Sequence, residues 1–402
     1  MIPFYAEELG NINALRITLS VPPTCDVAKT IEVKNNVLTL DGITVADLSS
    51  VNVQISADNL VVTRATETSE DGLLPWEIKL SLLQRSKILK SEQTEVKEWW
   101  TSKQLLKQPQ QRQFQCKHCS QVLVDASTDF KIKDLPSEHW YELIECWICH
   151  ETKPEEHRTR MKPILSRADV ILVGTTYFLI HPENIKADSI EVDPIVAKRV
   201  NWERGTLTKW IAINCSYCKN AIGEGQYCIE NNEEQLLAVK LYKYCIQLQP
   251  TLVEQPTFTD FLVSDLVNTA KTHATHRFLI QGQQSQHAFV LIWLFNWDIN
   301  IIHNNGYSND DCCKDDKLSR ERVIKVIYLD CRKEDEDSKK CLKLWLNDKS
   351  TDHLIYPDRV CDELVNELNQ SNLILPFYMR KMNHPAMIFT PNFSIGFIKK
   401  KT

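Results

Sequence analysis

The chain has 402 residues, of which 43% are hydrophobic and 25% are charged, and this composition is typical of a globular protein with two or three domains. A net charge of −6, without lysine and arginine runs interleaved with aromatic residues, argues against DNA or RNA as a direct partner. Acidic residues stand where a secretory signal would be basic, and the longest apolar run, residues 288–295, is far shorter than the roughly 20 residues of a membrane span. We therefore expect a protein of the cytoplasm, the nucleus or both, with no membrane partner.

Residues 1–85 consist of short runs in which apolar and polar residues alternate, the pattern of half-buried β-strands. The runs cover residues 15–19, 36–40, 51–55 and 60–64. Asp41 and Gly42 follow one of these runs and favour a type I′ hairpin turn. We expect an all-β module here, a sandwich or a small barrel, followed by a polar, glutamine-rich linker over residues 86–113.

The expected zinc domain covers residues 114–228 and contains two Cys-x-x-Cys turns with the same pattern, which bracket an insertion. Each turn follows an expected short strand and is followed at the same spacing by an aliphatic residue, Leu123 or Ile222. One tetrahedral zinc ion takes four thiolates, which two such turns supply from opposite ends of a domain of about a hundred residues. Four unrelated core cysteines are the alternative, but a repeated pattern rarely arises by chance. We predict one closed, structural zinc site in a β-rich domain, with Cys116, Cys119, Cys215 and Cys218 as ligands.

The insertion between the two turns begins with a helix signal, in which Ser137 is the expected N-cap and apolar residues recur at helical spacing up to Trp147. This helix would place Cys146, Cys149 and His150 on one face. The three residues are a candidate second metal cluster, and Cys149 is a candidate reactive thiol beside an imidazole. Packing into the core is the alternative, because cysteine is most often buried and the C-terminal end of a helix disfavours a thiolate.

Residues 229–402 combine helical and strand patterns, and we expect a mixed α/β region. The whole chain is therefore expected to be a multi-domain α+β protein. Expected helices cover residues 258–271 and 359–370. Expected strands cover residues 170–173 and 177–181 in the zinc domain, and 277–282, 288–296 and 322–329 in the C-terminal region. The charged stretches 309–322 and 333–340 are most simply solvated loops.

Cys361 is a further candidate for a reactive thiol. With Asp358 as N-cap, the thiol falls in the first turn of the expected helix, where backbone N–H groups stabilise an anion. The same residue also continues an apolar stripe formed by Leu364, Val365 and Leu368, so a core cysteine fits equally well. The chain has no glycine-rich phosphate loop, no Gly-x-Ser-x-Gly elbow and no His-Glu-x-x-His helix, so any chemistry is expected to be thiol chemistry.

Several short strings from the first Cys-x-x-Cys turn to the C-terminus resemble the HECT-like proteins that bind ubiquitin-conjugating enzymes. They lie at residues 135–140, 147–150, 215–224, 278–282, 291–296, 375–376 and 380–383. The resemblance implies a ubiquitin-protein ligase, a transferase that docks a charged ubiquitin-conjugating enzyme and promotes ubiquitin transfer. It also implies a cyclin or a pre-mRNA 3′-end processing factor as protein substrate.

True HECT ligases pass ubiquitin through a cysteine near the C-terminus, and Cys361 stands in the corresponding tail of this chain. The resemblance therefore makes Cys361, with Cys149 as the other candidate, a ubiquitin acceptor. A second hypothesis is a non-catalytic, zinc-braced adaptor or assembly factor, which holds a protein client such as a 3′-end processing factor. A zinc-dependent nucleic-acid module is a third, and the charge balance opposes it.

Overall fold

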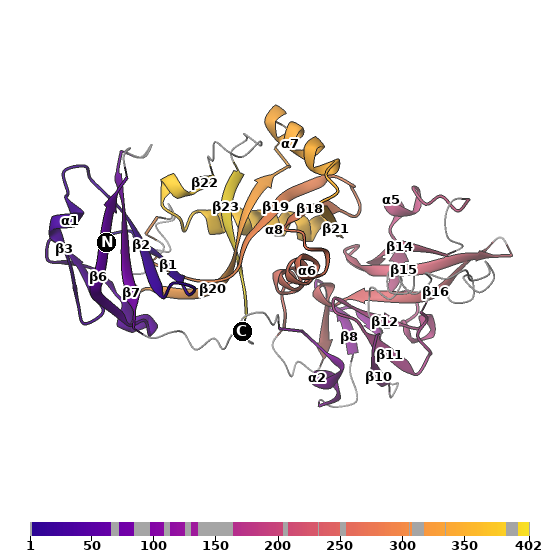
Figure 1. Cartoon of the computed structure of the whole chain (residues 1–402). Coiled ribbons are helices and arrows are strands. Elements are labelled where there is room, and N and C mark those ends of the chain that lie inside the picture. Colours follow the sequence, from indigo (N-terminus) through magenta and orange to yellow (C-terminus); the bar gives the residue numbers. More distant parts are fainter. Residues whose placement is uncertain are drawn as a thin grey trace, which may run out of the picture. The chain divides into compact units, whose positions relative to one another are not determined.

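The computed structural model shows a β-rich α+β fold with several sheets, the fold class expected from the sequence (Figure 1). Two compact units, each with its own buried core, consist of Met1–Lys97 with Leu262–Thr402, and of Glu98–Phe261. The structure describes residues 2–65, 72–83, 97–107, 113–124, 130–135, 164–203, 208–231, 233–249, 255–304, 306–307, 317–333, 335–382 and 393–401. None of the helices in these ranges is long and apolar enough to cross a bilayer.

A ten-stranded sheet dominates the first unit, with the strand order β22-β23-β20-β19-β1-β2-β7-β6 and with β18 joining β19 to β21. Its strands are β1 (Tyr5–Leu9), β2 (Ala14–Val21), β6 (Ile55–Arg64), β7 (Leu74–Leu82), β18 (Arg277–Gly282), β19 (Ala288–His303), β20 (Ser319–Asp330), β21 (Thr351–Tyr356), β22 (Lys381–Met382) and β23 (Phe393–Lys399). The N-terminal strands belong to the same sheet as the C-terminal region, because β1 pairs with the second half of β19 and places Tyr5 opposite His303.

A small three-stranded sheet of β3 (Ile31–Lys34), β4 (Val37–Leu40) and β5 (Ile43–Asp47) packs into the core of the N-terminal strands. The short helix α1 (Val27–Thr30) precedes it. The type I′ prediction is confirmed: Asp41 and Gly42 have φ values of 50° and 75°, the left-handed values that this turn requires. The strand expected at residues 51–55 was wrong, because the 3-10 helix η1 (Leu48–Val51) ends there and Asn52, at φ 56°, reverses the chain before β6 begins.

Helices α7 (Glu336–Leu346) and α8 (Asp358–Asn372) complete the first unit, together with α6 (Phe258–His273), which begins at the end of the second unit. The helices expected at residues 258–271 and 359–370 are confirmed. The solvated loops expected at residues 309–322 and 333–340 were wrong in part, because residues 319–322 belong to β20 and residues 336–340 to α7. Ser338, Cys341 and Trp345 form the buried stripe of α7, and its charged residues face away from this stripe.

The second unit contains a seven-stranded sheet, with the order β10-β11-β12-β16-β15-β14-β13, and a three-stranded sheet, with the order β17-β8-β9. Its strands are β8 (Gln113–Cys116), β9 (Val122–Val124), β10 (Lys131–Asp134), β11 (Val170–Val173), β12 (Tyr177–Ile180), β13 (Ile190–Val192), β14 (Thr208–Cys215), β15 (Ala221–Glu230), β16 (Glu233–Tyr242) and β17 (Ile246–Gln249). The short helix α2 (Ser102–Leu106) precedes β8, and the short helix α5 (Pro194–Ala197) lies between β13 and β14 in sequence. One buried core spans both sheets.

Part of the segment expected as a polar linker is packed into the second unit. Trp99 and Trp100 are buried, and the ammonium group of the buried Lys243 donates hydrogen bonds to their carbonyl oxygens at 2.9 and 3.3 Å. An ammonium group this deep in a protein requires such acceptors, because an unpaired buried charge is costly. The boundaries 1–85, 86–113, 114–228 and 229–402 stay a prediction.

Candidate metal centre

The two Cys-x-x-Cys turns face one another in the second unit. The sulfur atoms of Cys116, Cys119, Cys215 and Cys218 all lie within 4.8 Å of one another. Two pairs across the turns have Sγ–Sγ distances of 3.6 Å, Cys116 with Cys218 and Cys119 with Cys215. A disulfide has an S–S distance of about 2.0 Å, so these are free thiols brought together without a covalent bond.

The backbone has the same conformation in both turns. Ser120 and Lys219 each have φ 61°, and their N–H groups donate to the carbonyl oxygens of Cys116 and Cys215 at 2.8 Å. In both turns the amide of the first cysteine donates to the carbonyl five residues on, again at 2.8 Å. The first turn joins β8 to β9, and the second joins β14 to β15. The repeated sequence pattern therefore corresponds to a repeated three-dimensional element.

The aliphatic residue that follows each turn anchors it to the core. Leu123 and Ile222 are fully buried, in one hydrophobic cluster with Cys116 and Cys215. Gly223 follows directly and lies against β16, where a Cβ atom would come within 1.8 Å of the Lys240 carbonyl oxygen. Only glycine allows this approach. The hydrophobic core thus holds both turns in place through the residues that directly follow them.

Burial is the largest single influence on the pKa of Cys116, Cys119 and Cys218. It raises the pKa of Cys116 and Cys119 above the ordinary value. Burial acts in the same direction at Cys218, but hydrogen bonds from Asn220 and from the Cys119 and Cys116 thiols together outweigh it and lower the pKa of Cys218 to about 7. Four sulfurs this close cannot all ionise alone, because their negative charges repel one another. A divalent cation removes this obstacle and keeps the thiols that coordinate it deprotonated.

The donor set fits a tetrahedral metal ion. With Zn–S bonds of about 2.3 Å, the corners of the tetrahedron are about 3.8 Å apart, close to the 3.6 Å of the two pairs. Four sulfur ligands favour zinc or an iron–sulfur centre over hard cations such as magnesium or calcium. Four protein ligands also fill the coordination sphere and leave no open position, which is typical of a structural site.

The predicted second cluster of Cys146, Cys149 and His150 lies outside the described residues. Cys361 is described, and it is fully buried on the apolar stripe of α8. Its sulfur lies 3.6 Å from the Tyr356 carbonyl oxygen, and burial raises the pKa of this thiol to about 12. In this conformation the Cys361 side chain therefore packs as a core residue.

The predicted role of Asp358 as N-cap was wrong. Pro357 occupies the N-cap position without a side-chain bond, and Asp358 is the first helical residue of α8. The Asp358 carboxylate instead accepts hydrogen bonds from the amides of Gln284 at 3.0 Å and Ser285 at 3.0 and 3.2 Å. These residues form the turn between β18 and β19, so the aspartate fixes a distant turn rather than its own helix.

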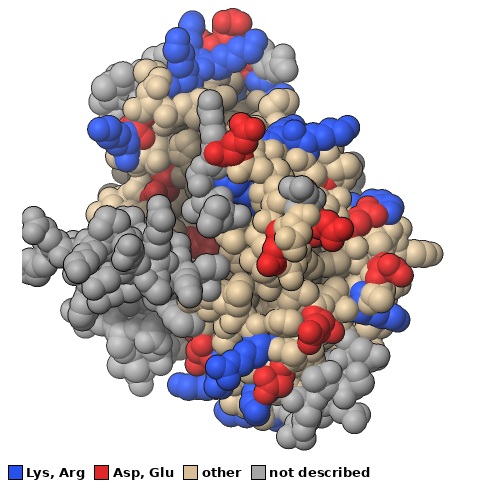
Figure 2. Space-filling view, turned by 90° about the vertical axis from the view of Figure 1, so that its right-hand side faces the viewer, with Lys and Arg blue, Asp and Glu red and all other residues tan. Residues whose placement is uncertain are grey.

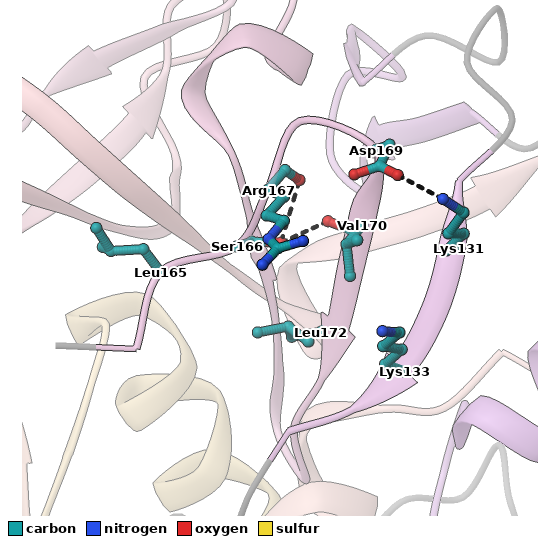
Figure 3. A pocket seen from close by; sticks show the side chains of 8 residues that line it. All are labelled: Lys131, Lys133, Leu165, Ser166, Arg167, Asp169, Val170 and Leu172. Carbon is teal, nitrogen blue, oxygen red and sulfur yellow. Dashed lines mark hydrogen bonds and ion pairs between the residues drawn. The ribbon is translucent and has the colours of Figure 1, made fainter.

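An open pocket of about 290 Å³ lies in the second unit, beside β10 and β11. Asp169 pairs with Lys131 at 2.8 Å, and the Ser166 hydroxyl donates to the Val170 carbonyl (Figure 3). The lining residues are Lys131, Lys133, Leu165, Ser166, Arg167, Asp169, Val170 and Leu172. No sequence pattern pointed to this pocket, because its residues come from two separate segments that only the parallel pairing of β10 with β11 brings together.

Acidic and basic side chains are interspersed over the described part of the face in Figure 2, without a continuous basic stripe. A nucleic-acid-binding surface concentrates lysine and arginine instead. This distribution agrees with the net charge of −6.

The profile of a family described as HECT-like ubiquitin-conjugating enzyme (E2)-binding matches residues 7–386. A protein of Mus musculus that is named an E3 ubiquitin-protein ligase is 28% identical over 71% of this chain and 70% of its own length. The protein of the same name from Pongo abelii is 25% identical over 71% of this chain and 72% of its own. An uncharacterized protein of Saccharomyces cerevisiae is 22% identical over 79% of each chain. No solved structure matches.

Proposed function

Because this chain belongs to the HECT-like family that binds ubiquitin-conjugating enzymes (E2), we propose that it is a ubiquitin-protein ligase, which binds an E2 and promotes transfer of ubiquitin to protein substrates. The observation that carries this proposal is the family match over residues 7–386, which extends through both units. The mouse and orangutan relatives that are named E3 ubiquitin-protein ligases support it. The partners we propose are an E2, ubiquitin and a protein substrate, in the cytoplasm or the nucleus.

Zinc is the ion that we propose for the four sulfurs of Cys116, Cys119, Cys215 and Cys218. A structural zinc ion supplies no reaction step, because four protein ligands exclude substrate from the metal. Its contribution is folding free energy, since it joins two turns that are about a hundred residues apart in sequence. The zinc-braced turns then present a fixed surface to a partner.

Two routes for ubiquitin are compatible with this proposal. In the first, a thiolate of this chain attacks the carbonyl carbon of the E2–ubiquitin thioester, a new C–S bond forms, and the E2 cysteine leaves as a thiolate. In the second, the amine of a substrate lysine attacks the same carbon directly. An isopeptide C–N bond forms, the C–S bond to the E2 breaks, and the proton that the amine loses is taken up by the departing E2 thiolate. Cys361 and Cys149 are the candidate thiols for the first route. Because Cys361 is fully buried, α8 would have to open before this thiol could react.

The experiment incubates the protein with activating enzyme, a panel of purified E2 enzymes and ubiquitin, and analyses the products on reducing and non-reducing gels. A ubiquitin adduct that reducing agent removes, and that is lost in Cys361→Ala or Cys149→Ala, would assign the acceptor. Faster discharge of E2-bound ubiquitin to lysine without such an adduct would support the second route. Neither adduct nor faster discharge, with any E2, would contradict ligase activity.

A non-catalytic adaptor is the second candidate function. The buried Cys361 and the closed sulfur site favour it, because neither offers a reactive group in this conformation. Such an adaptor would hold a protein client, for which a pre-mRNA 3′-end processing factor is the candidate. If the protein is an adaptor, the substitution Cys361→Ala should leave its affinity for the client unchanged.

A further inference from the structure

Tyr217 lies inside the second Cys-x-x-Cys turn, and its side chain is directed away from the core. It is 77% exposed, more than any other large hydrophobic residue in the described part of the chain. An exposed tyrosine alone requires no explanation, because single apolar side chains are common on protein surfaces. Its position is what matters here, since the two neighbouring cysteines belong to the sulfur cluster.

Hydrogen bonds fix the backbone on both sides of Tyr217. The amide of Ser216 donates to the Ser189 carbonyl at 3.1 Å, and its hydroxyl donates to the Asp188 carbonyl at 2.5 Å. After the tyrosine, Lys219 forms an ion pair with Glu191 at 2.6 Å. These contacts tie the turn to the chain before and within β13. The exposed aromatic side chain therefore projects from a turn whose backbone is held in place.

A rigid, exposed tyrosine has the properties of an interface anchor. Binding energy concentrates in a few residues, among which tyrosine is enriched. A tyrosine loses little conformational entropy on binding, because only two side-chain torsions have to be fixed. A preorganised backbone lowers the cost of binding further. The ring would enter an apolar pocket of the partner. The hydroxyl would donate a hydrogen bond to a polar acceptor at the edge of that pocket.

We infer that Tyr217 is an anchor residue for the E2, held in place by the metal-braced turn. This inference rests on the proposed function, and the family match, which includes the whole second unit, argues for an E2 as the occupant. Free ubiquitin and a second copy of this chain are the competing occupants. The metal ion then has no part in catalysis. Its role is to hold the turn that carries Tyr217 in the conformation that binds the E2.

The test measures the affinity of the full chain for each purified, uncharged E2 of a panel by biolayer interferometry. Tyr217→Ala is expected to weaken the affinity at least about tenfold, because it removes a central anchor. Tyr217→Phe keeps the ring and is expected to weaken it far less. The control is Ile229→Ala, which removes an apolar side chain that is 47% exposed on the same strand β15, about 26 Å along the strand from Ala221.

Bound zinc and the thermal midpoint are measured for each variant, and both are expected to match the wild type. Wild-type binding that survives in Tyr217→Ala would overturn the inference and leave the proposed function standing. Equal losses in Tyr217→Ala and Ile229→Ala would also overturn it. A loss that appears only for free ubiquitin, or only in self-association measured by light scattering, would assign the residue to a different occupant. No E2 binding by the wild type would overturn both proposals.

Discussion

At the scale of single residues, side chains from β1, β2 and β20 form a buried group of charges across the ten-stranded sheet. The carboxylate of Glu7 is 2% exposed and accepts hydrogen bonds from Lys325 and from the Tyr5 hydroxyl, both at 2.6 Å. Arg16 contacts the same carboxylate from β2. Buried ions of this kind add little stability over an apolar core, but removing one partner leaves the other uncompensated. Glu7 is thus the residue on which the group depends.

We expect Glu7→Gln to lower the free energy of unfolding by about 3–5 kcal/mol near pH 7, because Lys325 then keeps a buried charge without its counter-charge. Urea denaturation measures this change. The double variant Glu7→Gln with Lys325→Met is the control, and it is expected to recover part of the loss because the unpaired ammonium group of the buried Lys325 is then absent. A single variant as stable as the wild type would show that this group does not affect folding.

The same residue has a predictable pH dependence. Burial alone would raise the pKa of Glu7, but Lys325 and Arg16 outweigh it and hold the pKa below the ordinary value. A carboxylate with a lowered folded-state pKa contributes stability above its unfolded-state pKa, and this contribution is lost as the pH falls through the folded-state pKa. Between pH 6 and pH 3, the unfolding free energy of the wild type should therefore fall more steeply than that of Glu7→Gln. Parallel pH profiles would contradict this assignment.

At the scale of elements, the two Cys-x-x-Cys turns were readable from the sequence because their signal is local. The cysteine spacing, the left-handed residue at the end of each turn and the buried aliphatic residue all lie within eight positions. Helix α7 was not predicted. Its many charged residues indicated a solvated loop, and only three of its side chains are buried. The N-cap of α8 was missed because the Asp358 carboxylate bonds to a turn some 70 residues away in sequence.

We expect about one equivalent of zinc per chain and a second unit that unfolds without it. Cys215→Ser removes one of the four ligands and should abolish stoichiometric zinc binding, since three thiolates and a hydroxyl hold the ion much more weakly. Elemental analysis measures the metal, and hydrogen exchange at β14 and β15 measures the loss of structure. Cys228→Ser, a change on the same strand β15 outside the sulfur cluster, is the control. Purified wild type without any metal would refute the zinc assignment.

At the scale of the whole molecule, the sequence predicted the fold class and the clustering of four cysteines but could not predict which distant strands pair. Strands β11 and β18 begin and end where the sequence patterns do, at Val170–Val173 and Arg277–Gly282. In contrast, β1 lies between β2 and β19, and its partner β19 is about 300 residues away in sequence. Alternation identifies a strand and its buried face, but it carries no information about the strand beside it.

We expect deletion of residues 1–10 to destabilise the first unit, because it removes the strand that joins β2 to β19 and leaves two edges without hydrogen-bond partners. The deletion also removes Glu7, the counter-charge of Lys325. Size-exclusion chromatography should show aggregation, and the thermal midpoint should fall. Ile12→Ser is the control, because it changes an exposed residue in the following turn and leaves β1 intact. A monomeric truncated protein with an unchanged midpoint would contradict the role given to β1.

The distance in sequence between the two Cys-x-x-Cys turns has a consequence for biosynthesis. Cys116 and Cys218 are 102 positions apart, so the first pair of thiols leaves the ribosome well before the second. At about 5–20 residues per second, the delay is on the order of 5–20 s. During this interval the nascent chain carries half of a coordination sphere, which binds an ion only weakly and is open to oxidants. Translation speed and the supply of zinc should therefore both influence the yield of correctly folded protein.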